Sequence, residues 1–200
     1  MRRLLFTALA MTIVMTILTG LAYPLVITGV SQVAFHGQAN GSLVKSASGQ
    51  VVGSQIIGQN FTDAKGNPLA QWFQPRPSAA GADGYDAMAS GASNLGPSNP
   101  VLLKDVAQAA ASYRSFNHLS ASTSLPIDAV TSSGSGLDPE ISIANARLQA
   151  PRVAAARHLS VARVNQLITD ATVGRVLDVM GEPGVNVLDL NLAVARQSAG

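Results

Sequence analysis

An uninterrupted apolar run at the N-terminus constrains this chain more than any other feature. No Asp, Glu, Lys or Arg occurs between Leu4 and Val44, and Leu4–Phe35 is almost wholly apolar. A helix needs about 20 such residues to cross a bilayer, whereas the apolar core of a signal peptide has only about 7–15. We therefore predict an uncleaved transmembrane anchor, with a cleaved signal peptide as the alternative. Residues 1–35 are assigned to a short tail and this anchor, and residues 36–200 to one further domain.

The charges beside the apolar run predict its orientation. Arg2 and Arg3 precede the run, and the first charge after it is the single Lys45. Positive residues that flank a span are retained on the cytoplasmic side. We therefore predict a single-pass protein whose N-terminus is cytoplasmic and whose domain lies outside the cytoplasm.

Small and hydroxyl residues within the span predict a contact with another membrane helix. Five of them roughly share one face of the helix: Ala8, Thr12, Thr16, Thr19 and Gly20. Such residues let helix backbones approach closely in lipid, and Gly20 is the predicted contact point. The alternative is that these residues are merely tolerated in a membrane helix. Pro24 is expected to kink the helix or to end its regular part.

The composition of the chain excludes several classes of function. The formal net charge is +2, and Arg2 and Arg3 account for all of it, so the domain is neutral overall. A nucleic-acid binder shows a basic face instead, and we predict no nucleic-acid partner. The chain has no cysteine, which excludes a disulfide framework, a thiolate metal site and a Cys nucleophile.

Common catalytic and metal-binding motifs are missing from the sequence. There is no GxxxxGK[ST] phosphate loop, no GxSxG elbow and no HExxH zinc motif. His36, His118 and His158 are far apart in the sequence, so we expect solvated side chains and no metal site. Asp138 precedes a proline and is predicted to cap a helix. An anchored hydrolase that uses a Ser or Asp site remains a lower-ranked hypothesis.

Short strands and helices follow one another without regular βαβ alternation, which predicts an α+β domain after the single transmembrane helix. The expected strands are residues 42–45, 51–57, 72–73, 126–130 and 185–194. The expected helices are residues 100–116, a helix that starts at 138 or 142 and breaks at Pro151 before ending near 159, and residues 160–171. Asn99-Pro100 is the clearest signal, because Asn caps helices and Pro suits their first turn.

Two polar segments are candidate binding sites. Ser133, Ser135 and Gly136 would offer backbone amides to an anion at a helix N-terminus, with a plain turn as the alternative. The small residues of segment 90–100 would let a partner's backbone approach closely, with a flexible loop as the alternative. The predicted interface residues in that segment are Ser93, Asn94, Leu95, Gly96, Pro97 and Asn99.

Four arginines in the C-terminal third are expected on the surface. They are Arg147, Arg152, Arg157 and Arg163. Their spacing of five or six residues does not place them in one helical stripe, since a helix turns about 100° per residue. We therefore expect them to be spread around the surface or paired with acids.

Six sequence motifs in order give the chain a family likeness. They are GSQIIGQNF (Gly53–Phe61), WFQPRPSA (Trp72–Ala79), SGASNLGPSNP (Ser90–Pro100), VTSSGSGLDPEIS (Val130–Ser142), LQAPRVAAAR (Leu148–Arg157) and GEPGVNVLDLNLA (Gly181–Ala193). With the N-terminal anchor they cover nearly the whole chain. The chain resembles the KdpC family, whose members belong to the Kdp potassium-transporting P-type ATPase.

This resemblance implies an accessory subunit of a high-affinity, ATP-driven potassium uptake pump in the bacterial inner membrane. The implied partners are a channel-like potassium-binding subunit, a P-type catalytic subunit and a small membrane peptide. The family is described as a chaperone that raises the ATP affinity of the catalytic subunit. Direct nucleotide contact would then fall to Gln59, Ser133 and Ser135.

The sequence favours an indirect effect on ATP. The chain has no Asp-Lys-Thr-Gly-Thr phosphorylation motif, so we predict that it is not an enzyme by itself. The predicted topology also places the domain outside the cytoplasm, where ATP is scarce. We therefore expect a role in assembly, with no cofactor bound and with ATP acting through the complex. A stand-alone, membrane-anchored binding domain is the alternative function.

Overall fold

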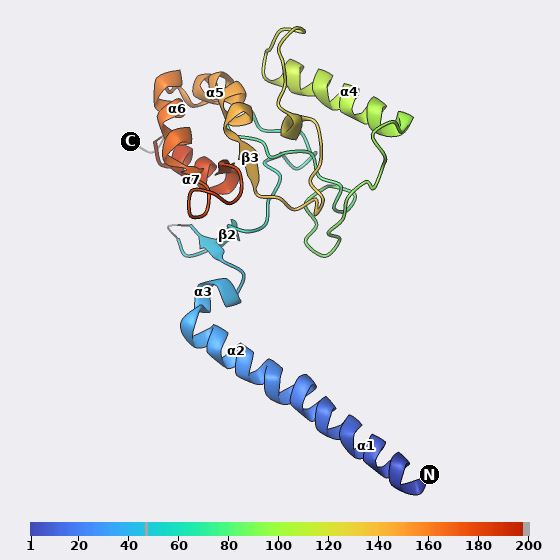
Figure 1. The fold of residues 1–200 in the computed structure, drawn as a ribbon. Helices are drawn as coiled ribbons and strands as arrows, with labels where there is room; N and C mark the ends of the chain where they lie inside the picture. The colour runs from blue at the N-terminus through green and yellow to red at the C-terminus, as the bar shows by residue number, and fades with distance from the viewer. Residues whose placement is uncertain (47, 198–200) are drawn as a thin grey trace. The chain divides into compact units, whose positions relative to one another are not determined.

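The chain folds into two compact units that divide between Leu43 and Val44. The computed structural model describes residues 1–46 and 48–197 (Figure 1). The first unit holds the apolar run, and the second holds the α+β domain that the sequence predicts. Each unit is described by itself below.

The first unit consists mainly of one long apolar helix. It is made of α1 (Arg2–Ile17), the π-helical turn η1 (Leu18–Ala22) and α2 (Tyr23–Ala34), which together are long and apolar enough to cross a membrane. A short helix, α3 (His36–Ala39), follows. Pro24 does not end the helix but lies in the first turn of α2, directly after η1. Proline removes a backbone hydrogen bond, and the π-helical turn is where the regular α-helix gives way.

The second unit contains two small sheets. β1 (Leu43–Lys45) pairs with β2 (Val51–Ser54). A second sheet has the order β3-β5-β4, from β3 (Glu140–Ser142), β5 (Gly184–Asn186) and β4 (Thr172–Val173), and both of its pairings are antiparallel. The central strand β5 is buried along its whole length, so this sheet belongs to the core.

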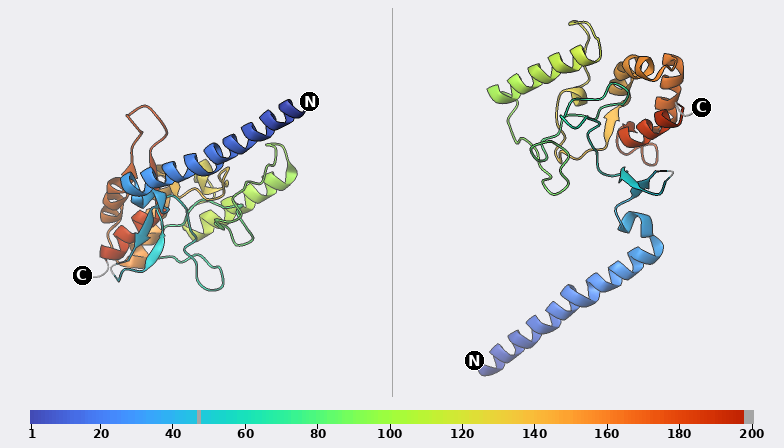
Figure 2. Two further views of the ribbon diagram at one scale, coloured as in Figure 1. Left: turned by 90° about the horizontal axis from the view of Figure 1, so that it is seen from below. Right: turned by 180° about the vertical axis from the view of Figure 1, so that it is seen from behind.

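Helices surround a long segment without regular structure. They are α4 (Pro100–Phe116), the 3₁₀ turn η2 (Ile127–Ala129), α5 (Ile143–Arg157), α6 (Val161–Asp170) and α7 (Val187–Gln197). The segment between β2 and α4 passes between α4 on one side and the group α5–α7 on the other (Figures 1 and 2). This irregular segment carries three of the motifs described above.

The hydrophobic core forms where α5, α6 and α7 meet the second sheet. Its fully buried side chains include Phe73, Ile141, Ile168 and Leu190. Phe73 comes from the irregular segment, so that segment is anchored in the core. Removing such a large buried ring costs about 3–5 kcal/mol of folding free energy.

The predicted starts of three helices are confirmed, each with a side-chain cap. α4 spans the predicted residues, and its Asn99 Oδ1 accepts the Val101 N–H at 2.9 Å. Ser142 caps α5, where its hydroxyl accepts the Asn145 N–H at 3.1 Å. Ser160 caps α6, where its hydroxyl accepts the Arg163 N–H at 3.1 Å. The predicted break at Pro151 is wrong, because α5 continues through it with Pro151 on an exposed side.

Three strand predictions are wrong. Residues 126–130 contain the η2 turn in place of a strand, and residues 72–73 lie outside any strand. In the segment 185–194, β5 ends at Asn186 and α7 begins directly after it. The side-chain oxygen of Asn186 accepts the Asp189 N–H at 3.1 Å, as a helix cap does, and this bond helps to turn the chain into a helix.

Candidate functional site

Two helices hold the irregular segment by its backbone. The Gln149 side chain of α5 accepts the Gln74 N–H at 2.8 Å and donates to the Gln74 carbonyl at 3.0 Å. The Asn191 side chain of α7 makes the same pair of bonds to Phe73, at 2.8 and 2.9 Å. Buried backbone groups need partners, and here amide side chains supply those that a neighbouring strand would otherwise give.

Arg152 adds a buried charge to this arrangement. Its side chain is 5% exposed, so the expectation that it lies on the surface is wrong. The guanidinium donates to the carbonyls of Ala70 and Trp72 and to Asn117 Oδ1, and lies 4.3 Å from the Phe116 ring centroid. Burial lowers the pKa of Arg152 to about 10. The cation is stabilised by neutral oxygens and a ring face, which fixes the irregular segment against α5.

Arg157, further along α5, also binds the irregular segment. Its guanidinium lies 3.9 Å from the Trp72 ring centroid, and its Nε donates to the Gln71 carbonyl at 3.0 Å. Burial lowers the pKa of Arg157 below its ordinary value. Arg147 and Arg163 are exposed, as expected. The two inward arginines therefore serve the motif around Trp72, while the other two lie on the surface.

Asp128 links η2 to the start of α5. Its carboxylate accepts the Ser142 N–H, the Ser142 hydroxyl and the Asn145 side-chain amide at 2.8–2.9 Å. The Tyr113 hydroxyl of α4 donates to Asn145 Oδ1 at 2.7 Å, and burial raises the pKa of Tyr113. This chain of bonds connects α4, η2 and α5.

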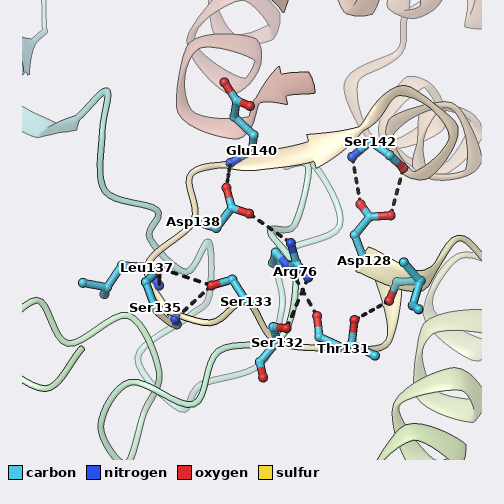
Figure 3. A network of polar contacts seen from close by, with 12 residues as sticks. Arg76, Asp128, Thr131, Ser132, Ser133, Ser135, Leu137, Asp138, Glu140 and Ser142 are labelled. Carbon is cyan, nitrogen blue, oxygen red and sulfur yellow. Dashed lines mark hydrogen bonds and ion pairs between the residues drawn. The ribbon is translucent and has the colours of Figure 1, made fainter. Parts of the chain in front are cut away.

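Arg76 organises the Ser/Gly loop, residues 131–138 (Figure 3). It forms an ion pair with Asp138 at 2.9 Å and donates to the carbonyls of Thr131 and Ser132 at 3.3 and 3.2 Å. The other carboxylate oxygen of Asp138 accepts the Glu140 N–H at 3.0 Å. The prediction that Asp138 caps a helix is wrong, because β3 follows the loop and Asp138 serves Arg76 and this strand instead.

The hydroxyls of Ser133 and Ser135 accept hydrogen bonds from within the Ser/Gly loop. Ser133 Oγ accepts the Gly136 N–H at 2.8 Å, and Ser135 Oγ accepts the Leu137 N–H at 3.1 Å. The two hydroxyls are 3.3 Å apart (Figure 3). Of the amides predicted to bind an anion, that of Gly136 is therefore engaged within the loop, and the role of the Ser133 and Ser135 amides stays a prediction.

Gln59 does not join the two serines. The neighbouring Gly58 N–H donates to the Leu137 carbonyl at 2.9 Å, so the main chain passes beside the Ser/Gly loop. The Gln59 side chain itself packs against Gly53 of β2, where a Cβ would collide with it. Among the hydrogen bonds of the described residues, none joins the Gln59 side chain to Ser133 or Ser135, and the role of these three residues stays a prediction.

The predicted interface segment is tied to the Ser/Gly loop at one end and to α4 at the other. Gly91 N–H and Ser90 Oγ donate to the Ser135 carbonyl at 2.8 and 3.0 Å. Asn99 caps α4. Between these two points the exposed residues include Ser93, Asn94, Gly96 and Pro97, with Leu95 half-buried. Segment 90–99 is therefore held at both ends and open in its middle.

Gly20 lies in the other unit, exposed on the long helix. A Cβ built there meets no atom within 4 Å outside the local helix backbone, so a larger side chain would fit this chain without a clash. The Thr12 and Thr19 hydroxyls donate to carbonyls four residues earlier, at 2.9 and 2.7 Å. Their hydrogen bonds are thus satisfied within the helix, and the role of Gly20 stays a prediction.

The residues that sequence reasoning missed share a detectable signal. Asn145, Gln149 and Arg152 lie at i, i+4 and i+7 on α5, which places them on one helical face. Polar residues at such spacing, among buried alanines, indicate a helix whose buried face hydrogen-bonds to the backbone of another segment.

His36, His118 and His158 are all exposed. Among the described residues, no group of three or more His, Cys, Asp or Glu side chains could hold a metal ion.

Comparison with known proteins finds relatives that match almost the whole chain. The family model described as "KdpC: K+-transporting ATPase, c chain" matches residues 5–196. A protein of Mycobacterium tuberculosis (strain ATCC 25618 / H37Rv), named "Potassium-transporting ATPase KdpC subunit", is 56% identical over 196 residues, which cover 98% of this chain and 100% of that one. Proteins with the same name from Caulobacter sp. (strain K31) and Gemmatimonas aurantiaca are 54% identical over 176 residues and 50% identical over 192. Those matches cover 88% and 96% of this chain, and 85% and 92% of theirs.

Proposed function

The chain belongs to the KdpC family of K+-transporting ATPase subunits, and on that premise we propose that it is a non-catalytic subunit which the pump needs for its assembly. Its anchor holds the N-terminus in the cytoplasm and the domain on the outer face of the bacterial inner membrane. The partners are the channel-like potassium-binding subunit, the P-type catalytic subunit and the small membrane peptide.

The closed hydrogen-bond network around Arg76 carries this proposal. Arg76 and Asp138 bind each other and the loop, and the hydroxyls of Ser133 and Ser135 bind the loop's own amides. Polar groups that hydrogen-bond to the loop's own backbone fix the position of that loop. The network therefore supports a structural task, which is to hold segment 90–99 in a fixed position.

Segment 90–99 is suited to contact with the channel-like subunit. Its exposed residues are small, and its ends are tied down by the Ser135 carbonyl and by the cap on α4. A segment that is ordered before binding loses little conformational entropy when it docks. We place this contact on the ion-entry side of the channel-like subunit.

Any effect on ATP affinity passes through the complex in this proposal. Direct nucleotide contact would require Gln59, Ser133 or Ser135, and both hydroxyls are engaged within the loop. We expect Gln59→Ala and the double variant Ser133→Ala/Ser135→Ala to leave the ATP dependence of transport unchanged in complexes that assemble. An assembled complex with a raised KM for ATP would show that direct contact is required.

The assembly role is tested by introducing an aromatic side chain into segment 90–99. Ser93→Trp should reduce recovery of the intact complex and potassium-limited growth, because a large side chain cannot fit where backbones approach closely. Asn94 is less suitable, since its φ of 53° would add backbone strain to any bulky variant. Met88→Trp is the matched control, at an exposed site of the same irregular segment.

Complex recovery also separates the proposal from its alternative. A stand-alone binding domain would purify without larger membrane subunits, and its deletion would leave those subunits assembled. We expect the deletion to abolish ATP-driven potassium uptake because no stable complex forms. A fully assembled but inactive complex without this chain would reject the assembly role.

A further inference from the structure

The connection between β4 and β5 is an ordered hairpin. Val176 and Met180 exchange two backbone hydrogen bonds, at 2.9 and 3.0 Å. Closer to the strands, Nη2 of Arg175 donates to both carboxylate oxygens of Glu182, at 2.8 and 2.9 Å. The backbone of this excursion is therefore fixed by its own contacts.

The end of this hairpin is apolar and open to solvent. Val176, Leu177, Val179 and Met180, which we call the apolar tip, are 61–83% exposed. In the described part of the second unit, large apolar side chains are exposed at twelve positions. Five of them fall between Val173 and Met180, and the other seven are scattered between Val51 and Val161. A local concentration of this kind marks an interaction surface, whereas isolated apolar residues do not.

The turn at the tip is not built for its own stability. Leu177 and Asp178 have φ values of 54° and 59°, so both central residues lie in the left-handed region. They are the central residues of the turn Val176–Val179, within a three-residue loop between the paired Val176 and Met180. A residue such as Leu in the left-handed conformation costs about 1–2 kcal/mol relative to its ordinary conformations. The side chain of Leu177 therefore needs an explanation outside the hairpin, and a contact with a partner provides one.

The charges of the hairpin favour a protein partner over a lipid surface. Segments that enter a membrane interface carry Lys, Arg and aromatic residues, and anionic lipids repel carboxylates. This hairpin has no aromatic residue and no Lys, its Arg175 is paired with Glu182, and Asp178 stands at its turn. A protein surface can place a hydrogen-bond donor or a cation opposite such a carboxylate.

We infer that the apolar tip docks into an apolar depression on another subunit of the pump complex, which presents a donor or cation to Asp178. This inference rests on membership of the complex, and it adds a second contact surface to segment 90–99. The tip supplies the buried area, and Asp178 sets the orientation.

The absence of cysteine from the chain gives a direct test. In Leu177→Cys the introduced thiol is the only one in the chain. We expect maleimide to label it at least tenfold more slowly in the intact complex than in the detergent-solubilised chain alone, and a thiol-linked photo-crosslinker at this position to join it to another subunit. Met88→Cys, at a side chain that is 94% exposed, should be labelled at the same rate in both preparations.

Two results would overturn the inference. Equal labelling of Leu177→Cys in the complex and in the free chain would show that the tip is unoccupied. Protection of the free chain in vesicles of phosphatidylcholine and phosphatidylglycerol, without any protein crosslink in the complex, would assign the tip to the membrane instead. This test probes only the hairpin, so it can fail while the Ser93→Trp test of the assembly role succeeds.

A second variant measures the contribution of the tip to assembly. Leu177→Ser/Met180→Ser should lower recovery of the complex severalfold, whereas Ile127→Ser, which also removes an exposed apolar side chain, should not. All three side chains are exposed, so folding of the domain is not at risk. Equal recovery of the complex with both variants would contradict the inference.

Discussion

The side-chain amide of Asn191 binds both backbone polar groups of Phe73, accepting its N–H at 2.8 Å and donating to its carbonyl at 2.9 Å. A β-strand partner would make the same pair of bonds. Gln149 repeats the arrangement on the next residue, Gln74. The motif around Trp72 is thus held like a strand although no strand adjoins it.

Asn191→Leu should lower the free energy of unfolding by about 2–4 kcal/mol, because the buried N–H and carbonyl of Phe73 lose their partners. Urea unfolding of the detergent-solubilised chain would measure this, followed by the fluorescence of Trp72, the only tryptophan. Arg196→Leu, at an exposed position of the same helix, is the control and should change stability little. Equal stability of the two variants would contradict the strand-like role of Asn191.

Arg152→Lys should destabilise the domain by more than about 2 kcal/mol, even though the charge is kept. A lysine cannot reach the Ala70 and Trp72 carbonyls and Asn117 together, and its buried ammonium would be left poorly paired. Arg147→Lys, on the exposed side of the same helix, should be neutral. The same urea titration compares the two variants. Similar midpoints would show that the hydrogen bonds of the Arg152 guanidinium contribute little to stability.

Gly136→Ala should disturb the Ser/Gly loop far more than Gly134→Ala. Gly136 has a φ of +68°, and a Cβ there would come within 2.8 Å of Ala80 and of the Gly91 carbonyl, whereas a Cβ on Gly134 meets nothing within 4 Å. We expect lower thermal stability and lower recovery of the complex for Gly136→Ala alone. Identical behaviour of the two variants would mean that the loop's position is unimportant for assembly.

Glu140→Gln should stabilise the domain at neutral pH. Burial, and to a smaller extent the Asp138 carboxylate, raises the pKa of Glu140 above its ordinary value of 4.5 in the folded chain. Ionised Glu140 therefore lowers stability above its folded-state pKa, and the penalty disappears once the pH falls below the unfolded value. The variant's higher urea midpoint at about pH 7–8 should converge with that of the parent chain below about pH 4, and a constant difference would contradict this origin.

Met88→Cys should also report the orientation of the anchor. If the domain lies outside the cytoplasm, a membrane-impermeant maleimide will label this exposed thiol in cells whose outer membrane has been permeabilised and whose inner membrane is intact. The substitution is far from Arg2 and Arg3, so it leaves unchanged the charges that set the orientation. Labelling that requires lysis of the inner membrane would reverse the proposed topology.

Local signals in the sequence predict some elements well. Asn99-Pro100 locates α4, and Ser142 and Ser160 mark the starts of α5 and α6, because a cap is a contact between near neighbours. The segment after Val185 is ambiguous, since Leu188, Leu190 and Leu192 alternate as in a strand while Val187, Leu190 and Val194 also fit a helix. Only packing against α6 and the cap from Asn186 decides between these periods.

The candidate site is less predictable, because its contacts join residues far apart in the chain. Ser133 and Ser135 are conspicuous in the sequence, but nothing local shows that their hydroxyls close on their own loop. The spacing of Arg152 from the other arginines suggests a surface position, whereas its partners are carbonyls some eighty residues earlier. Such contacts arise only when α5 meets the irregular segment.

The long helix of the first unit raises a question of hydrophobic mismatch. Its 33 residues extend about 50 Å at about 1.5 Å per residue, while the hydrocarbon layer is about 30 Å thick. Tilts of up to about 40° absorb part of this excess, so some helical turns stand in the headgroup layer. Gln32, whose side chain is hydrogen-bonded to Asn40 at 3.1 Å, is suited to that layer. Bilayer thickness thereby becomes a physical variable that acts on how many turns of this helix extend beyond the hydrocarbon layer.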